Sequence, residues 1–183
     1  MAAGTKKSTN LATIQGGTTA KVAGGVCKAD LRVSSDTVEV ATTNIDDAGD
    51  IILFGVVVPT SAIIRSCIIR ADDLDSGTNL AYDVGYYAAH KFVSKTSGTK
   101  TVRAQDAVLD ADALASAVTH GQAAEKTGVD VAFEAKDIAN CNKKVWEDLG
   151  YDEDPGGDVC IGLTVTTAGA GSGTISIEVR YSE

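Results

Sequence analysis

Apolar and polar residues alternate in two segments near the end of the sequence. Apolar side chains occupy every second position from Val159 to Val165 and again from Ile175 to Tyr181. A period of two gives each segment one face for a core and one for water, as in a β-strand. Residues 168–173 between them have no periodicity and contain three glycines. The pattern therefore predicts an antiparallel hairpin with a long loop, as a structural part of the fold.

Strand patterns also recur through the first two thirds of the chain. Residues 31–43 read as one or two short strands broken at Ser34 to Asp36, and a fully apolar strand over 51–58 ends at Pro59. Proline has no backbone N–H for a sheet ladder, so it marks a strand end. Three further strands are predicted over residues 62–71, 80–86 and 129–133.

Two segments have helical rather than alternating patterns. Residues 106–118 place Leu114 and Val118 four positions apart, with Asp110 or Asp112 available as a cap, which predicts a short helix. Residues 136–150 predict the clearest helix of the chain, ended by Gly150. Its apolar stripe consists of Ile138, Cys141, Val145, Trp146 and Leu149.

Many short antiparallel strands with few helices favour a mainly β fold. We expect an antiparallel β-sandwich of jelly-roll type over residues 31–183, as a single domain with one or two short helices inserted. Residues 1–30 contain almost no large apolar side chain and predict a flexible or extended N-terminal arm. We expect Leu11, Ile14 and Val22 of this arm to dock on another chain.

The charge balance narrows the classes of partner. Sixteen basic and 25 acidic residues give a net charge of −9, which repels phosphate and disfavours binding to nucleic acid. The longest apolar run, residues 51–58, is too short to span a membrane, and residues 1–10 lack the apolar core of a signal peptide. The expectation is a protein without a membrane partner, made in the cytoplasm.

No motif indicates catalysis or a cofactor. His90 and His120 lack the sequence context of a catalytic base, and no nucleophile elbow, zinc or phosphate-loop motif occurs. A serine, histidine and aspartate arrangement assembled in space stays open, although nothing recommends one. The four cysteines are not spaced as metal ligands and are expected to be buried or half-buried thiols: Cys27, Cys67, Cys141 and Cys160.

An acid-rich turn is the candidate ion site. Asp72, Asp73 and Asp75 resemble the start of a calcium loop, but the later ligands of such a loop are missing. Aspartate also forms turns by bonding to the local backbone, and this interpretation is favoured. The same two interpretations apply to the acid-rich segment 152–158.

Several residues are candidates for contacts with other chains. Trp146 suits a core or a subunit contact, and Tyr87 lies on the opposite strand face from Tyr82 and Tyr86. The loop containing Gly169, Gly171 and Gly173 is either a solvent-exposed tip or a small-residue surface laid against a partner.

A resemblance to a protein family rests on the order of several segments. These are "DIILFGVVVPTSAIIRSCIIRADDLDSG", "LAYDVGYY", "DADALASAV" and "VWEDLGYDEDPGGDVCIGLTVTTAGAGSGTISIEVRYSE", within residues 50–183. Together they resemble head decoration (cement) or auxiliary virion proteins of tailed bacteriophages.

The resemblance implies a non-enzymatic virion protein without a cofactor. Such a protein binds the major capsid protein on the outside of an assembled capsid and stabilises it, often as a homotrimer. The arm would then bridge subunits, and the protein would be located at the capsid surface. The alternative is a carbohydrate-binding jelly-roll module on a virion surface, for which an aromatic content of 5% is low.

Overall fold

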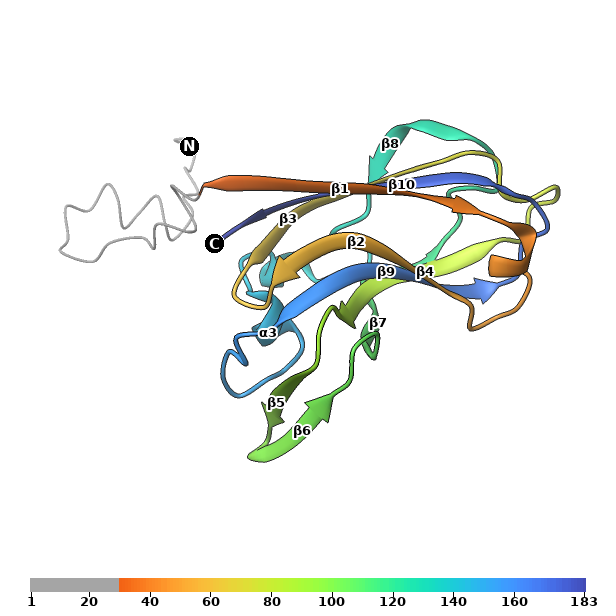
Figure 1. The fold of residues 1–183 in the computed structure, drawn as a ribbon. Coiled ribbons are helices and arrows are strands. Elements are labelled where there is room, and N and C mark those ends of the chain that lie inside the picture. The colour runs from red at the N-terminus through yellow and green to blue at the C-terminus, as the bar shows by residue number, and fades with distance from the viewer. Residues whose placement is uncertain (1–29) are drawn as a thin grey trace, which may run out of the picture.

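The computed structural model describes residues 30–183, which form two antiparallel sheets packed face to face (Figure 1). The first sheet contains β1 (Leu31–Val40), β10 (Gly173–Ser182), β3 (Ile63–Ala71) and β8 (Glu125–Asp130), in that order. The second contains β2 (Ile51–Pro59), β9 (Asp158–Thr167), β4 (Ala81–Ala88) and β7 (Val108–Val118). The remaining elements are β5 (Phe92–Thr96), β6 (Thr99–Arg103), η1 (Thr42–Asn44), η2 (Ile138–Asn140) and α3 (Val145–Asp148).

Strand pairing across the sandwich is nested. β1 pairs with β10, β2 with β9, β3 with β8 and β4 with β7, all antiparallel. The chain therefore runs out through four strands and returns beside them in reverse order. The predicted antiparallel β-sandwich is confirmed, and the nested pairing is consistent with the jelly-roll type.

The core lies between the two sheets and consists of alternate strand residues. On β9 and β10 the predicted positions are buried, with Ile161 and Ile177 fully enclosed. The strands that share the second sheet with β9 contribute Val56, Val84 and Leu114, which are also fully enclosed. Each such aliphatic side chain contributes about 1.5–3 kcal/mol when removed from water, so this layer stabilises the fold.

The prediction of a hairpin over residues 158–183 is wrong. β9 lies between β2 and β4, whereas β10 lies between β1 and β3 in the other sheet. Residues 168–172 cross from one sheet to the other. Alternation identifies the buried face of a strand but does not identify its neighbour, and both strands have a buried face.

The prediction of a helix over residues 106–118 is also wrong, because this segment is the strand β7. Leu114 and Val118 are four positions apart, an even spacing that places both on one face of a strand as well as of a helix. β7 packs closely on β4 at Gly85, where a Cβ would lie 2.0 Å from the carbonyl oxygen of Asp110. The glycine thus permits this close strand approach.

Only part of the helix predicted over residues 136–150 forms. The segment contains the short η2 and the four-residue α3, and Ile138 is 80% exposed. The backbone N–H groups of Val145 and Trp146 donate to the carbonyls of Ala62 and Thr60, which fixes the start of α3 against the β2–β3 turn. Gly150 has a φ of +67° just after α3, as expected for a residue that ends a helix.

Two smaller differences concern strand ends. β1 is continuous through Ser34 to Asp36, where a break was expected, because every residue of β1 is paired with β10. β8 ends at Asp130, before Val131 and Phe133. The assignment of residues 1–30 to an arm stays a prediction.

Candidate functional site

Four loops meet at one end of the sandwich, here called the loop end: residues 41–50, 72–80, 119–124 and 168–172. The amide of Gly171 donates to the carbonyl of Leu74 at 2.9 Å, and that of Gly169 donates to Ile45 at 2.8 Å. The amide of Leu74 donates in turn to Gly121 at 2.8 Å. The structure therefore brings together the acid-rich turn and the glycine loop, which are far apart in the sequence.

The glycines of residues 168–173 are packed against their own chain. A Cβ on Gly171 would lie 2.5 Å from the carbonyl carbon of Leu74, and one on Gly173 would lie 2.9 Å from Cβ of Asp72. Gly169 is buried, whereas Ala170 and Ser172 are exposed. Close packing within the chain explains the small residues, and contact of this loop with a partner stays a prediction.

The aspartates of the acid-rich turn accept backbone hydrogen bonds. Asp75 is buried, and its carboxylate accepts from the amides of Leu80 at 2.9 Å, Asn79 at 2.7 Å and Gly77 at 3.1 Å. These bonds hold the pKa of Asp75 below its usual value. Asp73 accepts from the amide of Asp75 at 3.2 Å. The contacts support the turn interpretation, and residues 30–183 contain no group of three side chains that could hold a metal.

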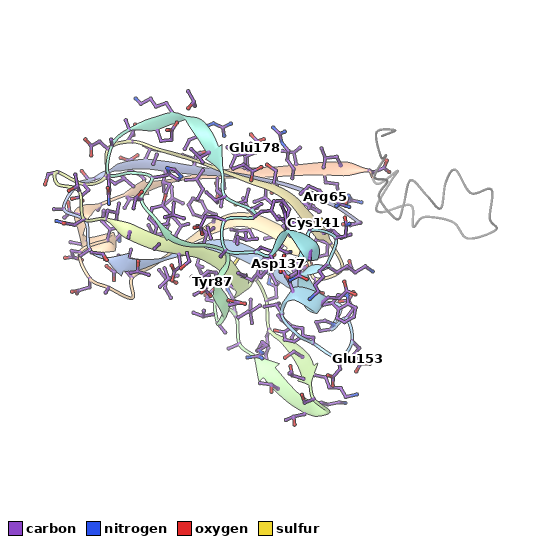
Figure 2. All side chains as sticks on the ribbon, turned by 180° about the vertical axis from the view of Figure 1, so that it is seen from behind. Arg65, Tyr87, Asp137, Cys141, Glu153 and Glu178 are labelled. Atoms are coloured by element: carbon purple, nitrogen blue, oxygen red, sulfur yellow. The ribbon has the colours of Figure 1, made fainter. Side chains whose placement is uncertain are left out.

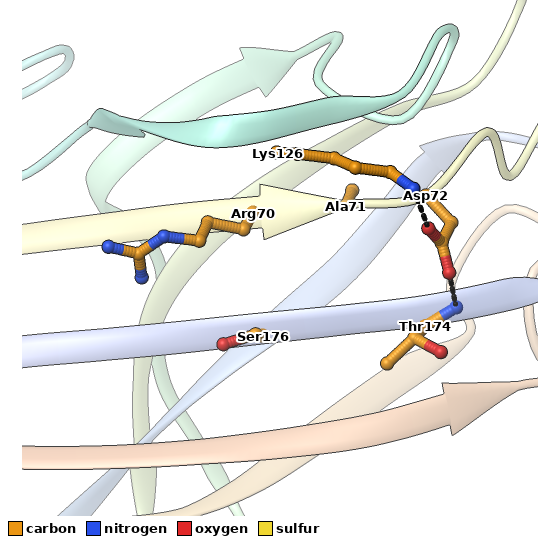
Figure 3. Close-up of a pocket in the computed structure, with 6 residues that line it drawn as sticks. All are labelled: Arg70, Ala71, Asp72, Lys126, Thr174 and Ser176. Atoms are coloured by element: carbon orange, nitrogen blue, oxygen red, sulfur yellow. Dashed lines mark hydrogen bonds and ion pairs between the residues drawn. The ribbon is translucent and has the colours of Figure 1, made fainter.

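Asp72 lies in a shallow pocket of about 200 Å³ beside this turn (Figure 3). Its carboxylate accepts from the amide of Thr174 at 3.0 Å and pairs with Lys126 at 3.5 Å. These interactions hold the pKa of Asp72 below its usual value, with the Thr174 amide as the larger cause. The Asp72 and Lys126 side chains of this pocket are thus paired with each other.

A second pocket, of about 370 Å³, is strongly acidic. Asp110, Asp112, Asp137 and Asp148 line it together with Lys136. The Lys136 Nζ lies 2.6 Å from Oδ2 of Asp148, and Lys136 is buried whereas Asp148 is half-buried. Burial, with a contribution from the neighbouring Asp112 carboxyl, raises the pKa of Asp110.

A raised carboxyl pKa is a property of some catalytic acids. The other lining residues are Ala113, Ala135 and Asn140, and none of the eight lining residues is a serine, cysteine or histidine. The pocket therefore lacks a nucleophile for acyl transfer.

The aromatic candidates have little exposed surface. Tyr87 is fully buried on the outer face of its sheet, where its hydroxyl bonds to Thr164 and its ring lies close to Gly162 (Figure 2). Trp146 is half-buried. All phenylalanine, tyrosine and tryptophan residues of the chain are described, and none is exposed. A role of Tyr87 or Trp146 in an interface stays a prediction. The burial of Tyr87 does not support such a role for that residue. Leu11, Ile14 and Val22 lie outside the described residues.

The cysteines behave as expected within the described part. Cys67 and Cys160 are buried, Cys141 is half-buried, and all three are free thiols. His90 is exposed and His120 is half-buried. Among residues 30–183, no helix is long and apolar enough to cross a membrane.

The β5–β6 hairpin is a surface that the sequence reasoning missed. It forms its own two-stranded sheet and projects from the sandwich beside the loop 151–157 (Figure 1). The ring of Phe92 contacts Tyr151 edge to face with centroids 6.4 Å apart, and the Arg103 guanidinium lies 5.8 Å from the centre of the same ring. Asp152 accepts from the amides of Ser97 at 2.9 Å and Gly98 at 2.8 Å, which fixes the turn.

A sequence signal for this hairpin exists in the Ser97-Gly98 pair. Both residues have positive φ, +49° and +78°, as a tight two-residue hairpin turn requires. The flanking residues are mostly threonine and lysine with few apolar side chains, so the alternation that marks the other strands is weak there.

No protein-family model and no curated protein matches the chain. Two solved structures share its fold. One, described as "Capsid of Ralstonia phage GP4", contains a chain with a TM-score of 0.50 and 24% identity, aligned over 86% of each chain. The other, described as "Cyanophage Pam1 capsid asymmetric unit", gives a TM-score of 0.50 and 15% identity over 91% of this chain and 94% of that one. At these identities the similarity shows a shared β-sandwich fold.

Proposed function

We propose that this protein is a non-enzymatic structural protein of a phage virion. It binds the major capsid protein on the outside of an assembled capsid and stabilises the capsid, as a decoration or cement protein. It acts as a homo-oligomer, for which we propose a trimer, and is made in the host cytoplasm before joining the virion.

The observation that carries the proposal is the fold match along almost the whole chain. Both matched chains come from phage capsid structures, and the alignments leave at most 14% of this chain uncovered. The buried core between the sheets and the hydrogen bonds among the loops of the loop end also suit a rigid scaffold.

The N-terminal segment is the proposed bridge between subunits. Residues 1–30 contain four lysines and one acidic residue, Asp30, whereas the rest of the chain contains 12 basic and 24 acidic residues. An arm of this charge is complementary to an acidic neighbour. Ordering such an arm costs about 1–2 kcal/mol per residue in backbone entropy, so repeated contacts in a lattice favour it.

The test is a binding experiment with purified capsids lacking this protein. We expect the full chain to bind the capsids and to raise the temperature at which they lose their contents. A variant without residues 1–26 should bind more weakly and give a smaller shift. Absence of binding by the full chain would contradict the proposal, and equal binding by both would contradict only the role of the arm.

The carbohydrate-binding alternative gains no support from the surface. Sugar recognition by stacking needs exposed aromatic rings, and no aromatic residue of this chain is exposed. We therefore place the structural role first.

A further inference from the structure

The β5–β6 hairpin is basic, although the protein is acidic. Residues 91–103 contain Lys91, Lys95, Lys100 and Arg103 and no acidic residue. The rest of residues 30–183 contains eight basic and 25 acidic residues. The hairpin is therefore a compact positive surface on a negative body.

One face of the hairpin is anchored and the other is open. Directly opposite residues of an antiparallel pair point to the same face, so Phe92 and Arg103 share the face that contacts Tyr151. The other face has the pairs Val93 with Val102 and Lys95 with Lys100. Val93 is 50% exposed and Val102 is 60% exposed.

The charge of this face is only partly compensated within the chain, where Val93, Lys95 and Lys100 line a pocket with Glu153 and Asp154 of the adjoining loop. Like charges directly opposite each other in a sheet are destabilising, and an isolated two-stranded hairpin is only marginally stable. Within the described residues the ion-pair partner of Lys95 is Glu153, at 3.9 Å and largely exposed. An acidic surface with apolar contacts would complement this face.

The loop end of the protein provides such a surface. Its four loops contain six aspartates and no lysine or arginine: Asp46, Asp47, Asp50, Asp72, Asp73 and Asp75. Asp46, Asp47 and Asp73 are exposed. Ile51, which follows the first loop, is 44% exposed and adds an apolar contact point.

The two surfaces lie at opposite ends of the same strand. Residues 72–80 lead directly into β4, and the hairpin follows β4 after Ala89, His90 and Lys91 (Figure 1). Eight strand residues span roughly 25 Å. The hairpin of one chain is thus too far from its own loop end to pair with it, but can reach that of a second copy.

We propose that the open face of the β5–β6 hairpin docks on the loop end of a second copy of this chain. The contact joins two different surfaces, so repeated rotation can close it into a ring, as a trimer requires. This inference specifies the self-association within the proposed function, and it can be tested on the isolated protein without capsids.

The test reverses the charges of the hairpin lysines and of the loop-end aspartates, separately and together. It measures the native mass and the dissociation constant of self-association. We expect Lys95→Glu with Lys100→Glu to raise the dissociation constant on the order of tenfold or more, and Asp46→Lys with Asp47→Lys to do the same. Combining all four changes in one chain should restore association, because the charges at the contact are then complementary again. Melting temperatures of all variants verify that each is folded.

A matched control reverses two lysines outside the hairpin. Lys143→Glu with Lys144→Glu alters exposed residues before α3 and produces the same change in net charge. This control should associate like the wild type. An equal loss in the control, or no recovery in the four-residue variant, would overturn the proposal.

The capsid experiment separates this inference from the proposed function. If the wild type is a single chain at every concentration and the hairpin variant loses only capsid binding, the hairpin docks on the capsid protein and the inference is wrong. If self-association follows the exchanged charges but no capsid is bound, the inference holds and the proposed function fails.

Discussion

Lys136 and Asp148 form an ion pair inside the protein, with the lysine Nζ 2.6 Å from the aspartate Oδ2. Their side chains are 3% and 12% exposed. The Tyr86 hydroxyl donates to the same carboxylate oxygen at 3.4 Å. Lys136 lies early in the long connection between β8 and β9, and Asp148 is the last residue of α3 in the same connection. The pair thus ties these two parts of the connection together and, through Tyr86, to β4.

Removing one partner of this pair should strongly destabilise the protein. Lys136→Met leaves the Asp148 carboxylate, which is only 12% exposed, without its counter-charge, so we expect a loss of about 3–5 kcal/mol in the free energy of unfolding, measured in urea. Adding Asp148→Leu to that variant should recover much of the loss. Lys126→Met, which breaks the exposed pair with Asp72, serves as control and should change little. A Lys136→Met protein as stable as the wild type would show that the pair does not form.

The glycine loop should not tolerate a side chain at position 171. Gly171→Ala places a methyl group 2.5–2.6 Å from the carbonyl of Leu74, so we expect a loss of about 1–3 kcal/mol from forced backbone shifts. Gly77→Ala is the control, because its nearest neighbour would lie at 3.5 Å, an ordinary contact. Equal unfolding free energies for the two variants would contradict the packing described for this loop.

Replacing the loop as a whole should have a larger effect. A two-residue Asn-Gly turn can join neighbouring strands of one sheet, but residues 168–172 join strands of two sheets about 10 Å apart. We expect this replacement to abolish cooperative thermal unfolding.

Asp75 should contribute stability that disappears in acid. Its pKa is held below the value of the unfolded chain, about 3.9, by three backbone amides. The stabilisation is therefore fully present above about pH 4 and is lost as the pH falls through the lower, folded-state pKa. Asp75→Asn should melt at a lower temperature than the wild type at pH 7, and the difference should shrink as the pH approaches that pKa.

The comparison curve for this titration comes from Ser76→Ala, in the same turn, which removes no carboxyl group. Its difference in melting temperature from the wild type should stay constant with pH. A constant difference for Asp75→Asn as well would mean that the Asp75 carboxylate is not stabilised by the turn.

The buried thiols should be unreactive in the folded protein. Burial raises the pKa of Cys67 well above its usual value and also raises the pKa of Cys160, so little thiolate forms near neutral pH. In a protein with Cys27→Ser and Cys141→Ser, we expect almost no labelling by a thiol-specific disulfide reagent at pH 8. Denaturant should expose both remaining thiols. Rapid labelling without denaturant would indicate that the sheets open.

The sequence identified most strands because alternate burial leaves a direct trace in the residue order. The burial of Ile161 and Ile177 followed from the period of two. The partner of each strand left no such trace, since β9 and β10 would read the same in one sheet or in two. The error over residues 106–118 has a related cause, because a four-residue spacing suits both kinds of element.

The candidate site was predictable only in its local parts. The Asp75 turn followed from the preference of aspartate for backbone amides, and the structure adds that it packs on the glycine loop. The approach of Gly171 to Leu74 depends on the three-dimensional path of two distant loops. The hairpin surface was missed because each face mixes apolar with polar residues, Phe92 with Ser94 on one and Val93 with Lys95 on the other, so neither face appears as a core.

The nested pairing has a consequence for how the protein is made. β10 lies between β1 and β3, so neither of these strands has its full set of neighbours until β10 has been synthesised. Leu31 is paired with Ser182, at nearly the greatest sequence separation that the described chain allows. Such non-local pairing slows folding, because the cost of loop closure precedes the gain from contact. The first sheet therefore forms only after translation has passed β10, and until then the unpaired edges of β1 and β3 depend on protection from aggregation in the cell.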